Sequence, residues 1–216
     1  MSSRDTILRR LRGELSKSPP VSKPEAVEVW PCENLTPAEM AERFAKELTE
    51  VHGEVIRCAS IEDARRRLAE LAAQAEWIAL GAMDRPMVRD AAADLPAEMV
   101  QWAASDWQPR RIAEFSASAI EADCLLADTG SCLISCPTAE DRLICYLPPA
   151  CVVIARVDQL TEHLPAAWPS IAARAAEPTL GGEFLIVTGP SRTADIEKIL
   201  ILGVHGPKRL VVMLVG

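Results

Sequence analysis

The sequence predicts an α/β protein in which a twisted, mostly parallel sheet is flanked by helices. The first observation is alternation: from residue 36 onward, short apolar runs of strand length alternate with segments of helical periodicity. The second is size, because 216 residues, of which 49% are hydrophobic, suffice for one domain with a buried core. The third is the segment 183–198, which combines a buried strand, a sharp turn and the start of a helix.

The N-terminal segment, residues 1–24, is predicted to be a helix followed by a proline-rich linker. Apolar residues between Ile7 and Leu15 have the spacing of an amphipathic helix. The prolines at 18–24 favour an extended, exposed chain. A helix tethered in this way often docks on a neighbour or a partner chain, although a frayed terminus explains the pattern about as well.

The first half of the main domain is predicted to alternate helices with strands. Thr36 caps a helix that begins at Pro37 and ends at Glu50, and Ser60 caps a second helix that buries Leu68 and Leu71. The other expected elements are strands at 54–59, 77–80 and 99–102 and helices at 84–93 and 116–122. Such alternation implies a parallel sheet with helices on both faces.

In the second half, two apolar runs around the tetrapeptide Asp-Thr-Gly-Ser predict a strand, a turn and a second strand. The elements expected after them are a strand at 150–156, a helix at 159–175 interrupted by prolines, a strand at 184–187, a helix at 194–202 capped by Thr193, and a strand at 210–215. The chain shows no internal repeat.

The charge of the chain excludes some function classes. A formal net charge of −8, from 23 basic and 31 acidic residues, argues against broad attraction to DNA, RNA or an anionic membrane. No apolar stretch approaches the roughly 20 residues that span a bilayer. Arginines occupy the N-terminus in place of the apolar region of a signal peptide, so we expect a cytoplasmic protein.

The seven cysteines are predicted to be structural thiols. An odd number in a chain of this size does not favour a disulfide scaffold. Five of them lie between Cys124 and Cys151, but their intervals match neither a Cys-x-x-Cys pair nor a ferredoxin pattern. Several sit in apolar runs, where cysteine packs as a small hydrophobe. The common metal and nucleotide motifs are also missing, so the sequence predicts no metal site.

Three glycine-bearing turns, at 128–131, 188–193 and 205–207, are expected to converge on an anion site. Ligands of open parallel sheets bind beyond the carboxyl ends of the strands, and the first two turns follow predicted strands. The first turn of the helix expected at 194–202 would add unpaired N–H groups that favour a carboxylate or phosphate. The predicted anion-binding residues are Thr129, Gly130, Ser131, Gly189, Ser191, Arg192, Thr193 and Gly206.

Two residues are candidates for catalysis. His205 lies in a predicted loop and can act as an acid or base near neutral pH, although hydrogen bonds to the backbone also explain a histidine beside glycine and proline. Asp128 precedes the Thr–Gly turn, where an Asx-turn explains it about as well as a ligand role. Glu121, on the short helix expected at 116–122, can face either solvent or the cleft.

The last part of the chain carries a likeness to a known family. The strings GEFLIVTGPSRTADIE and LGVHGPKRLVVMLV, together with the upstream ADTGS, are similar to the C-terminal signature and the glycine turn of the LUD-domain family. The likeness covers roughly residues 36–216. On this reading residues 25–216 form the LUD domain, and residues 1–24 are an appendage.

The resemblance implies a fold similar to that of ribose-phosphate isomerases, glucosamine-phosphate deaminases and coenzyme A transferases. It also implies a subunit of a lactate utilization system that oxidises L-lactate to pyruvate alongside partner subunits carrying iron–sulfur clusters. This chain lacks ferredoxin-like cysteine repeats, so it resembles the cluster-free members, and no cofactor is evident in it. The residues themselves support a site of carboxylate size.

The sequence is also compatible with two other functions. The chain can be a free-standing, isomerase- or transferase-like enzyme acting on phosphorylated or coenzyme A-linked substrates, by analogy with the related folds. It can also be a non-catalytic assembly scaffold, in which the N-terminal helix and linker serve as a docking arm.

Overall fold

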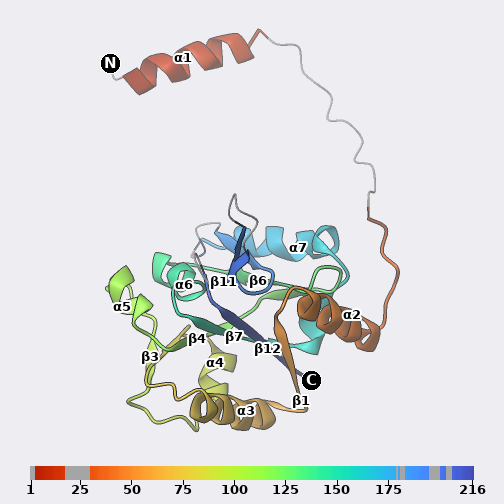
Figure 1. Cartoon of the computed structure of the whole chain (residues 1–216). Coiled ribbons are helices and arrows are strands. Elements are labelled where there is room, and N and C mark those ends of the chain that lie inside the picture. The colour runs from red at the N-terminus through yellow and green to blue at the C-terminus, as the bar shows by residue number, and fades with distance from the viewer. Residues whose placement is uncertain (1–2, 18–29, 179, 181–182, 195–199, 203–205) are drawn as a thin grey trace. The chain divides into compact units, whose positions relative to one another are not determined.

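The computed structural model describes residues 3–17, 30–178, 180, 183–194, 200–202 and 206–216, with the backbone alone described for 192–194 and 200–202 (Figure 1). The chain divides into two compact units, Met1–Pro31 and Cys32–Gly216. Among the described residues, no helix combines the length and the apolar character that crossing a membrane requires.

The N-terminal unit contains the predicted amphipathic helix, α1 (Ser3–Leu15). None of its residues is buried, and the apolar side chains of Ile7, Leu11 and Leu15 are all more than half exposed. The helix is therefore confirmed, and its apolar side chains are open to solvent.

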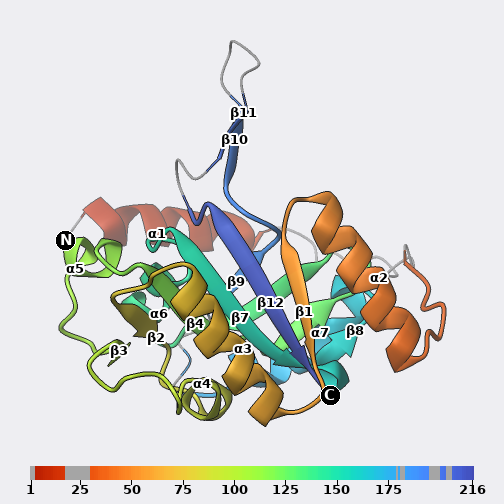
Figure 2. The same ribbon diagram turned by 60° about the horizontal axis from the view of Figure 1, so that its bottom comes forward.

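The larger unit is built on a six-stranded sheet whose strands are all parallel, as expected. Its strands, in spatial order, are β1 (Glu54–Cys58), β12 (Arg209–Val215), β7 (Ala150–Arg156), β4 (Ala117–Glu121), β2 (Leu80–Ala82) and β3 (Val100–Trp102). Figure 2 shows β12 lying between β1 and β7, so that the C-terminal strand occupies the interior of the sheet.

Helices α3 (Ile61–Gln74) and α4 (Pro86–Ala91) cover one face of this main sheet (Figure 1). Side chains of a strand point alternately to opposite faces. Val211 and Met213 accordingly pack in one core with α3 and α4, whereas Leu210 and Val212 pack in the core on the other face.

The opposite face is covered by helices and by a second sheet. The sequence predicted a single sheet, so this second sheet was not expected. The helices are α2 (Pro37–Glu50), α5 (Pro109–Ala113) and α6 (Ala139–Ile144). The second sheet has the order β8 (Leu160–Thr161), β5 (Cys124–Leu126), β6 (Ser131–Ser135) and β9 (Phe184–Val187). A short 3₁₀ turn, η1 (Val157–Gln159), precedes β8, and α7 (Leu164–Ala175) packs on the outer side of this sheet.

The predicted helix starts of α2 and α3 are confirmed in detail. The Thr36 hydroxyl accepts from the Glu39 N–H while the Glu39 carboxylate accepts from the Thr36 N–H, which forms a capping box. Ser60 caps α3 by accepting from the Asp63 N–H. Leu68 and Leu71 are both buried, as their helical spacing indicates.

Two elements in the first half differ from the prediction. The strand expected at 77–80 lies later, as β2, and the helix expected at 116–122 is the interior strand β4. Alanine favours helices, but Ala117, Ser118 and Ala119 are fully buried between neighbours on both faces of the sheet. Tertiary packing therefore overrides helix propensity here.

Two further helices were placed wrongly in the second half. The helix expected at 159–175 begins only at Leu164, because η1 and β8 occupy its first residues. The helix expected at 194–202 is contradicted by two antiparallel strands, β10 (Arg192–Ala194) and β11 (Leu200–Leu202). The β-branched residues Thr193 and Ile201 stand opposite each other in this pairing, and such residues favour strands. Thr193 is therefore not a helix cap.

Candidate functional site

A polar cavity of about 320 Å³ lies at the carboxyl end of the main sheet. Arg85 follows β2, Glu121 ends β4 and Gln159 follows β7, so three parallel strands deliver side chains to it. The second sheet and α7 close the other side. The remaining lining residues are Asp123, Cys124, Leu133, Ser170, Ile171, Arg174 and Phe184. Open parallel sheets bind ligands at this edge, which makes the cavity our candidate site.

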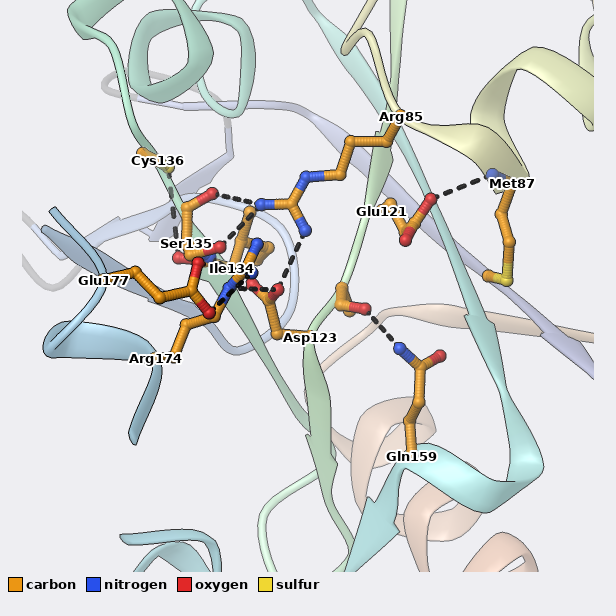
Figure 3. A network of polar contacts seen from close by, with 11 residues as sticks. Arg85, Met87, Glu121, Asp123, Ile134, Ser135, Cys136, Gln159, Arg174 and Glu177 are labelled. Atoms are coloured by element: carbon orange, nitrogen blue, oxygen red, sulfur yellow. Dashed lines mark hydrogen bonds and ion pairs between the residues drawn. The ribbon is translucent and has the colours of Figure 1, made fainter. Parts of the chain in front are cut away.

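Arg85 lines the cavity, and its side chain joins a network of polar contacts (Figure 3). Its guanidinium donates to Asp123 Oδ1 at 2.8 Å, to the Ser135 carbonyl at 2.8 Å and to the Ser135 hydroxyl at 2.6 Å. Asp123 Oδ2 also accepts from the Ser135 N–H. The side chains of Arg85 and Asp123 are only 13% and 19% exposed, so this charge-assisted network joins the two sheets in a largely dry environment.

Arg174 enters the cavity region from α7. Its Nη1 pairs with both carboxylate oxygens of Glu177, at 3.0 and 3.1 Å. Its Nε lies 3.6 Å from Asp123 Oδ1, which is too long for a good hydrogen bond. Within the described residues, this Nε is the buried side-chain nitrogen that lacks a hydrogen-bond partner. Buried polar groups are normally paired, so the Nε–H is a donor suited to a bound molecule.

Glu121 supplies a titratable group with a shifted pKa to the cavity. Its Oε2 accepts from the Met87 N–H in the first turn of α4, at 3.0 Å (Figure 3). Burial raises the pKa of the Glu121 carboxyl above its usual value, against the opposing effects of the Met87 hydrogen bond and of Arg85. A carboxylate whose pKa is raised in a cavity is a stronger base than one in water, as general acid–base chemistry requires.

The raised pKa of Glu121 predicts a pH-dependent effect of Glu121→Gln. Ionising Glu121 costs more in the folded protein than in the unfolded chain, so its charge lowers stability increasingly as the pH rises from the unfolded pKa through the folded pKa. Glutamine keeps an acceptor for Met87 without the charge. We expect the variant to melt higher than the natural protein at pH 7 and at the same temperature at pH 3. A gain that persists at pH 3 would point to packing instead of charge.

The three turns predicted from the sequence do come together, but at the opposite edge of the main sheet. The Ser131 hydroxyl lies 2.7 Å from the Thr188 hydroxyl, which joins the first turn to the second. The Ser191 N–H donates to the Pro207 carbonyl at 2.9 Å, which joins the second turn to the third. Pro207 precedes β12 and Gly189 lies against Val51, just before β1, so these turns lie near the amino ends of two of the parallel strands.

The predicted anion-binding residues have mixed positions. Gly189, Ser191 and Gly206 line an open pocket of about 500 Å³ with residues of β9 and the end of α6. Thr129 is exposed and hydrogen-bonds Ser131 and Asp128, so this part of the first turn is held by contacts within itself. Gly130 is buried, and Arg192 and Thr193 lie in β10. His205 falls outside the described residues. The sequence predicted that the N-terminus of a helix would attract the anion here. Residues Arg192–Ala194 form strand β10 instead, so that contribution is lost.

The burial of the cysteines agrees with the predicted packing role, with one exception. Six of the seven are buried, and Cys32 is exposed. Burial raises the pKa of Cys151 to about 12 and raises that of Cys132 further. Thiols of this kind are inert at neutral pH.

The structure also assembles a group of metal-ligand type that the sequence did not predict. Cys32, Glu162 and His163 place a thiol, a carboxylate and an imidazole within 4.8 Å of one another. Cys32 and His163 are 131 positions apart, so no spacing rule reveals them.

Sequence reasoning missed most of the lining of the main cavity. Arg85 follows a strand whose end was misplaced, Gln159 was assigned to the start of a helix that begins later, and Glu121 was assigned to a helix. Asp123 and Arg174 reach the cavity only because the second sheet and α7 fold over the first sheet. One rule could have identified part of the lining: polar residues that directly follow parallel strands lie together at the carboxyl edge of the sheet.

The sequence is similar to those of two curated proteins. The chain is 31% identical over 107 residues to "Lactate utilization protein C" of Bacillus pumilus, covering 49% of the chain and 45% of that relative. It is 30% identical over 103 residues to "Lactate utilization protein C" of Deinococcus radiodurans, covering 46% and 47%. The matched region thus spans about half the length of these curated relatives.

The chain also resembles a solved structure and matches a protein family. The crystal structure of a DUF162 family protein from Deinococcus radiodurans superimposes with a TM-score of 0.64 over 84% of this chain and 99% of that one, at 18% identity, which shows a shared fold. The LUD domain family matches residues 41–215, from α2 to the end of β12. The chain therefore belongs to the LUD-domain family.

Proposed function

We propose that this chain is a component of a lactate utilization system, in which it holds a small carboxylate during the oxidation of L-lactate to pyruvate. Membership of the LUD-domain family and the names of its curated relatives support this role. The structural observation that carries the proposal is the cavity at the carboxyl edge of the main sheet, whose lining groups include the carboxyl of Glu121 and the buried Arg174 Nε–H, which lacks a hydrogen-bond partner.

The size and chemistry of the cavity suit a ligand of this class. A volume of about 320 Å³ is at the small end of ligand pockets and exceeds what a three-carbon acid occupies. In the proposed complex, the lactate carboxylate accepts from Arg174 Nε. The charge-assisted hydrogen bond would satisfy a donor that is otherwise buried without a partner.

Glu121 is proposed as the base that accepts the substrate hydroxyl proton. Oxidising L-lactate to pyruvate removes two electrons and two hydrogens as protons, one from the hydroxyl and one with the carbon–hydrogen bond. The raised pKa of Glu121 makes its ionised form a better proton acceptor. The two electrons would pass to partner subunits that carry iron–sulfur clusters, and the proton from the carbon–hydrogen bond would be released to solvent. The exposed apolar side chains of α1 support docking of the N-terminal unit in such an assembly.

Calorimetric titration of the purified chain with L-lactate and with pyruvate tests the proposal. We expect one site, and we expect Arg174→Gln to weaken binding about 10-fold or more, because a hydrogen bond to a charged group contributes about 1.5–3 kcal/mol. Arg209→Gln is the matched control: Arg209 has a similar exposed fraction and also pairs with a carboxylate, Glu54, but it lies at the other end of the sheet.

The variant Arg192→Ala distinguishes this cavity from the site first predicted. The proposal expects Arg192→Ala to bind lactate as the natural chain does. Loss of binding in Arg192→Ala with full binding in Arg174→Gln would move the anion site to the turns at the amino edge of the sheet. Absence of measurable heat with either acid would contradict a carboxylate-binding role.

A further inference from the structure

We propose that Cys32, Glu162 and His163 form a binding site for a zinc ion, independent of the cavity and of the proposed role in lactate oxidation. The three residues come from two distant segments: Cys32 precedes α2, and Glu162 and His163 connect β8 to α7. The three potential ligand atoms all lie within 4.8 Å of one another.

The spacing of the ligand atoms fits a tetrahedral ion. Cys32 Sγ and His163 Nε2 are 3.7 Å apart. A zinc ion bound to sulfur at about 2.3 Å and to nitrogen at about 2.05 Å separates the two ligand atoms by about 3.5 Å in tetrahedral geometry. A carboxylate oxygen at about 2.1 Å would lie at similar distances from both. Small side-chain movements therefore complete the site.

The backbone already holds these groups in place. The Glu162 carboxylate accepts from the N–H groups of Glu33 and Leu35, across the turn in which Asn34 adopts a φ of 59°. His163 is the N-cap of α7, and its Nδ1 accepts from the Ala166 N–H at 3.1 Å. The imidazole is thereby oriented with Nε2 toward Cys32. A ligand set fixed by the fold loses little freedom on binding a metal.

The charge of Glu162 also favours a cation. The side chain is buried at 9% exposure, and within the described part of the chain no lysine or arginine forms an ion pair with it. Buried carboxylates are usually paired with a cation or coordinate a metal. A thiolate with an imidazole selects zinc over magnesium or calcium, which prefer all-oxygen ligands.

Binding requires one rearrangement of protons. While Nδ1 accepts from Ala166, the neutral imidazole carries its proton on Nε2. When zinc takes the Nε2 lone pair, the proton must move to Nδ1, and the hydrogen bond from Ala166 to the ring is given up. The Ala166 N–H keeps the His163 carbonyl as an acceptor at 3.1 Å, so this backbone donor is not left unpaired. The thiol of Cys32 loses its proton to solvent when sulfur binds the ion.

The test uses the full chain, stripped of metal with a chelator and titrated with cobalt(II) and then with zinc. We expect one cobalt ion per chain with a thiolate-to-cobalt absorption band in the near ultraviolet, displaced by one equivalent of zinc and not by magnesium. Bound zinc should also protect Cys32, the exposed cysteine, from a thiol reagent.

Two variants and a control locate the site. Cys32→Ser should fold normally because Cys32 is exposed, and it should lose the thiolate band and at least 100-fold in zinc affinity. His163→Asn keeps a good N-cap for α7 but removes Nε2, and we expect a comparable loss. Cys58→Ser, which alters a buried thiol elsewhere, should bind as the natural chain does. Zinc affinity unchanged in Cys32→Ser, or a cobalt complex without the thiolate band, would overturn the proposal.

Discussion

Replacing Arg85 with methionine is expected to lower the free energy of unfolding by about 3–5 kcal/mol, the usual cost of removing one partner of a buried ion pair. Methionine preserves much of the apolar stem of Arg85. It leaves the nearly buried Asp123 with only the longer, 3.6 Å contact to Arg174, and it removes the donor that Arg85 supplies to the carbonyl and hydroxyl of Ser135. Urea unfolding followed by tryptophan fluorescence measures the loss.

A surface pair provides the control for this prediction. Arg156 pairs with Asp158, and both side chains are more than half exposed, so Arg156→Met should cost less than about 1 kcal/mol. Adding Asp123→Asn to Arg85→Met removes the stranded charge, and we expect the double variant to be more stable than Arg85→Met alone. Equal losses for Arg85→Met and Arg156→Met would show that the network between the two sheets contributes little.

Replacing Gly130 with alanine is expected to destabilise the protein by about 3 kcal/mol or more. Gly130 has a φ of 63°, in the left-handed region that side chains other than glycine's disfavour. A Cβ at this position would lie 2.3 Å from Leu48 N and 2.7 Å from Leu48 Cα, inside the backbone of α2. Helix α2 cannot retreat cheaply, because Phe44 and Leu48 are fully buried in the main core.

Calorimetric melting of Gly130→Ala beside Gly13→Ala measures this effect. Gly13 lies in α1 and has no atom within 4 Å of an added Cβ, so alanine there should leave the melting temperature unchanged or raise it. A Gly130→Ala protein that melts like the natural chain would contradict the close packing of the turn on α2. The packing also accounts for glycine at this position without any ligand.

Local signals in the sequence were sufficient for much of the fold. Thr36 with Pro37 at the first helical position predicted α2, the Ser60 cap and the apolar spacing of Leu68 and Leu71 predicted α3, and the apolar runs predicted β7 and β12. Each of these signals depends on neighbouring residues alone. Where tertiary packing decides, as for the alanine-rich β4, helix propensity was misleading.

The site was predicted less well, because its location depends on the arrangement of strands in space. The turn at 128–131 follows an apolar strand, but that strand belongs to the second sheet. The rule about the carboxyl ends of parallel strands therefore did not apply to it. Arg85 and Glu121 do stand at such ends, which becomes visible only once β2 and β4 are placed side by side in the parallel sheet. The second turn, at 188–193, was favoured because a helix was expected after it, and that segment contains β10.

The central claim is that the cavity at the carboxyl edge binds a small carboxylate through Arg174. Proton–nitrogen NMR spectra of arginine Nε–H groups, recorded while L-lactate is added, test it most directly. The Arg174 resonance, assigned by its absence from the Arg174→Gln spectrum, should shift and saturate as a buried donor without a hydrogen bond gains an acceptor. An Arg174 resonance that stays in place at saturating lactate, while that of Arg192 or no arginine shifts, would contradict the account.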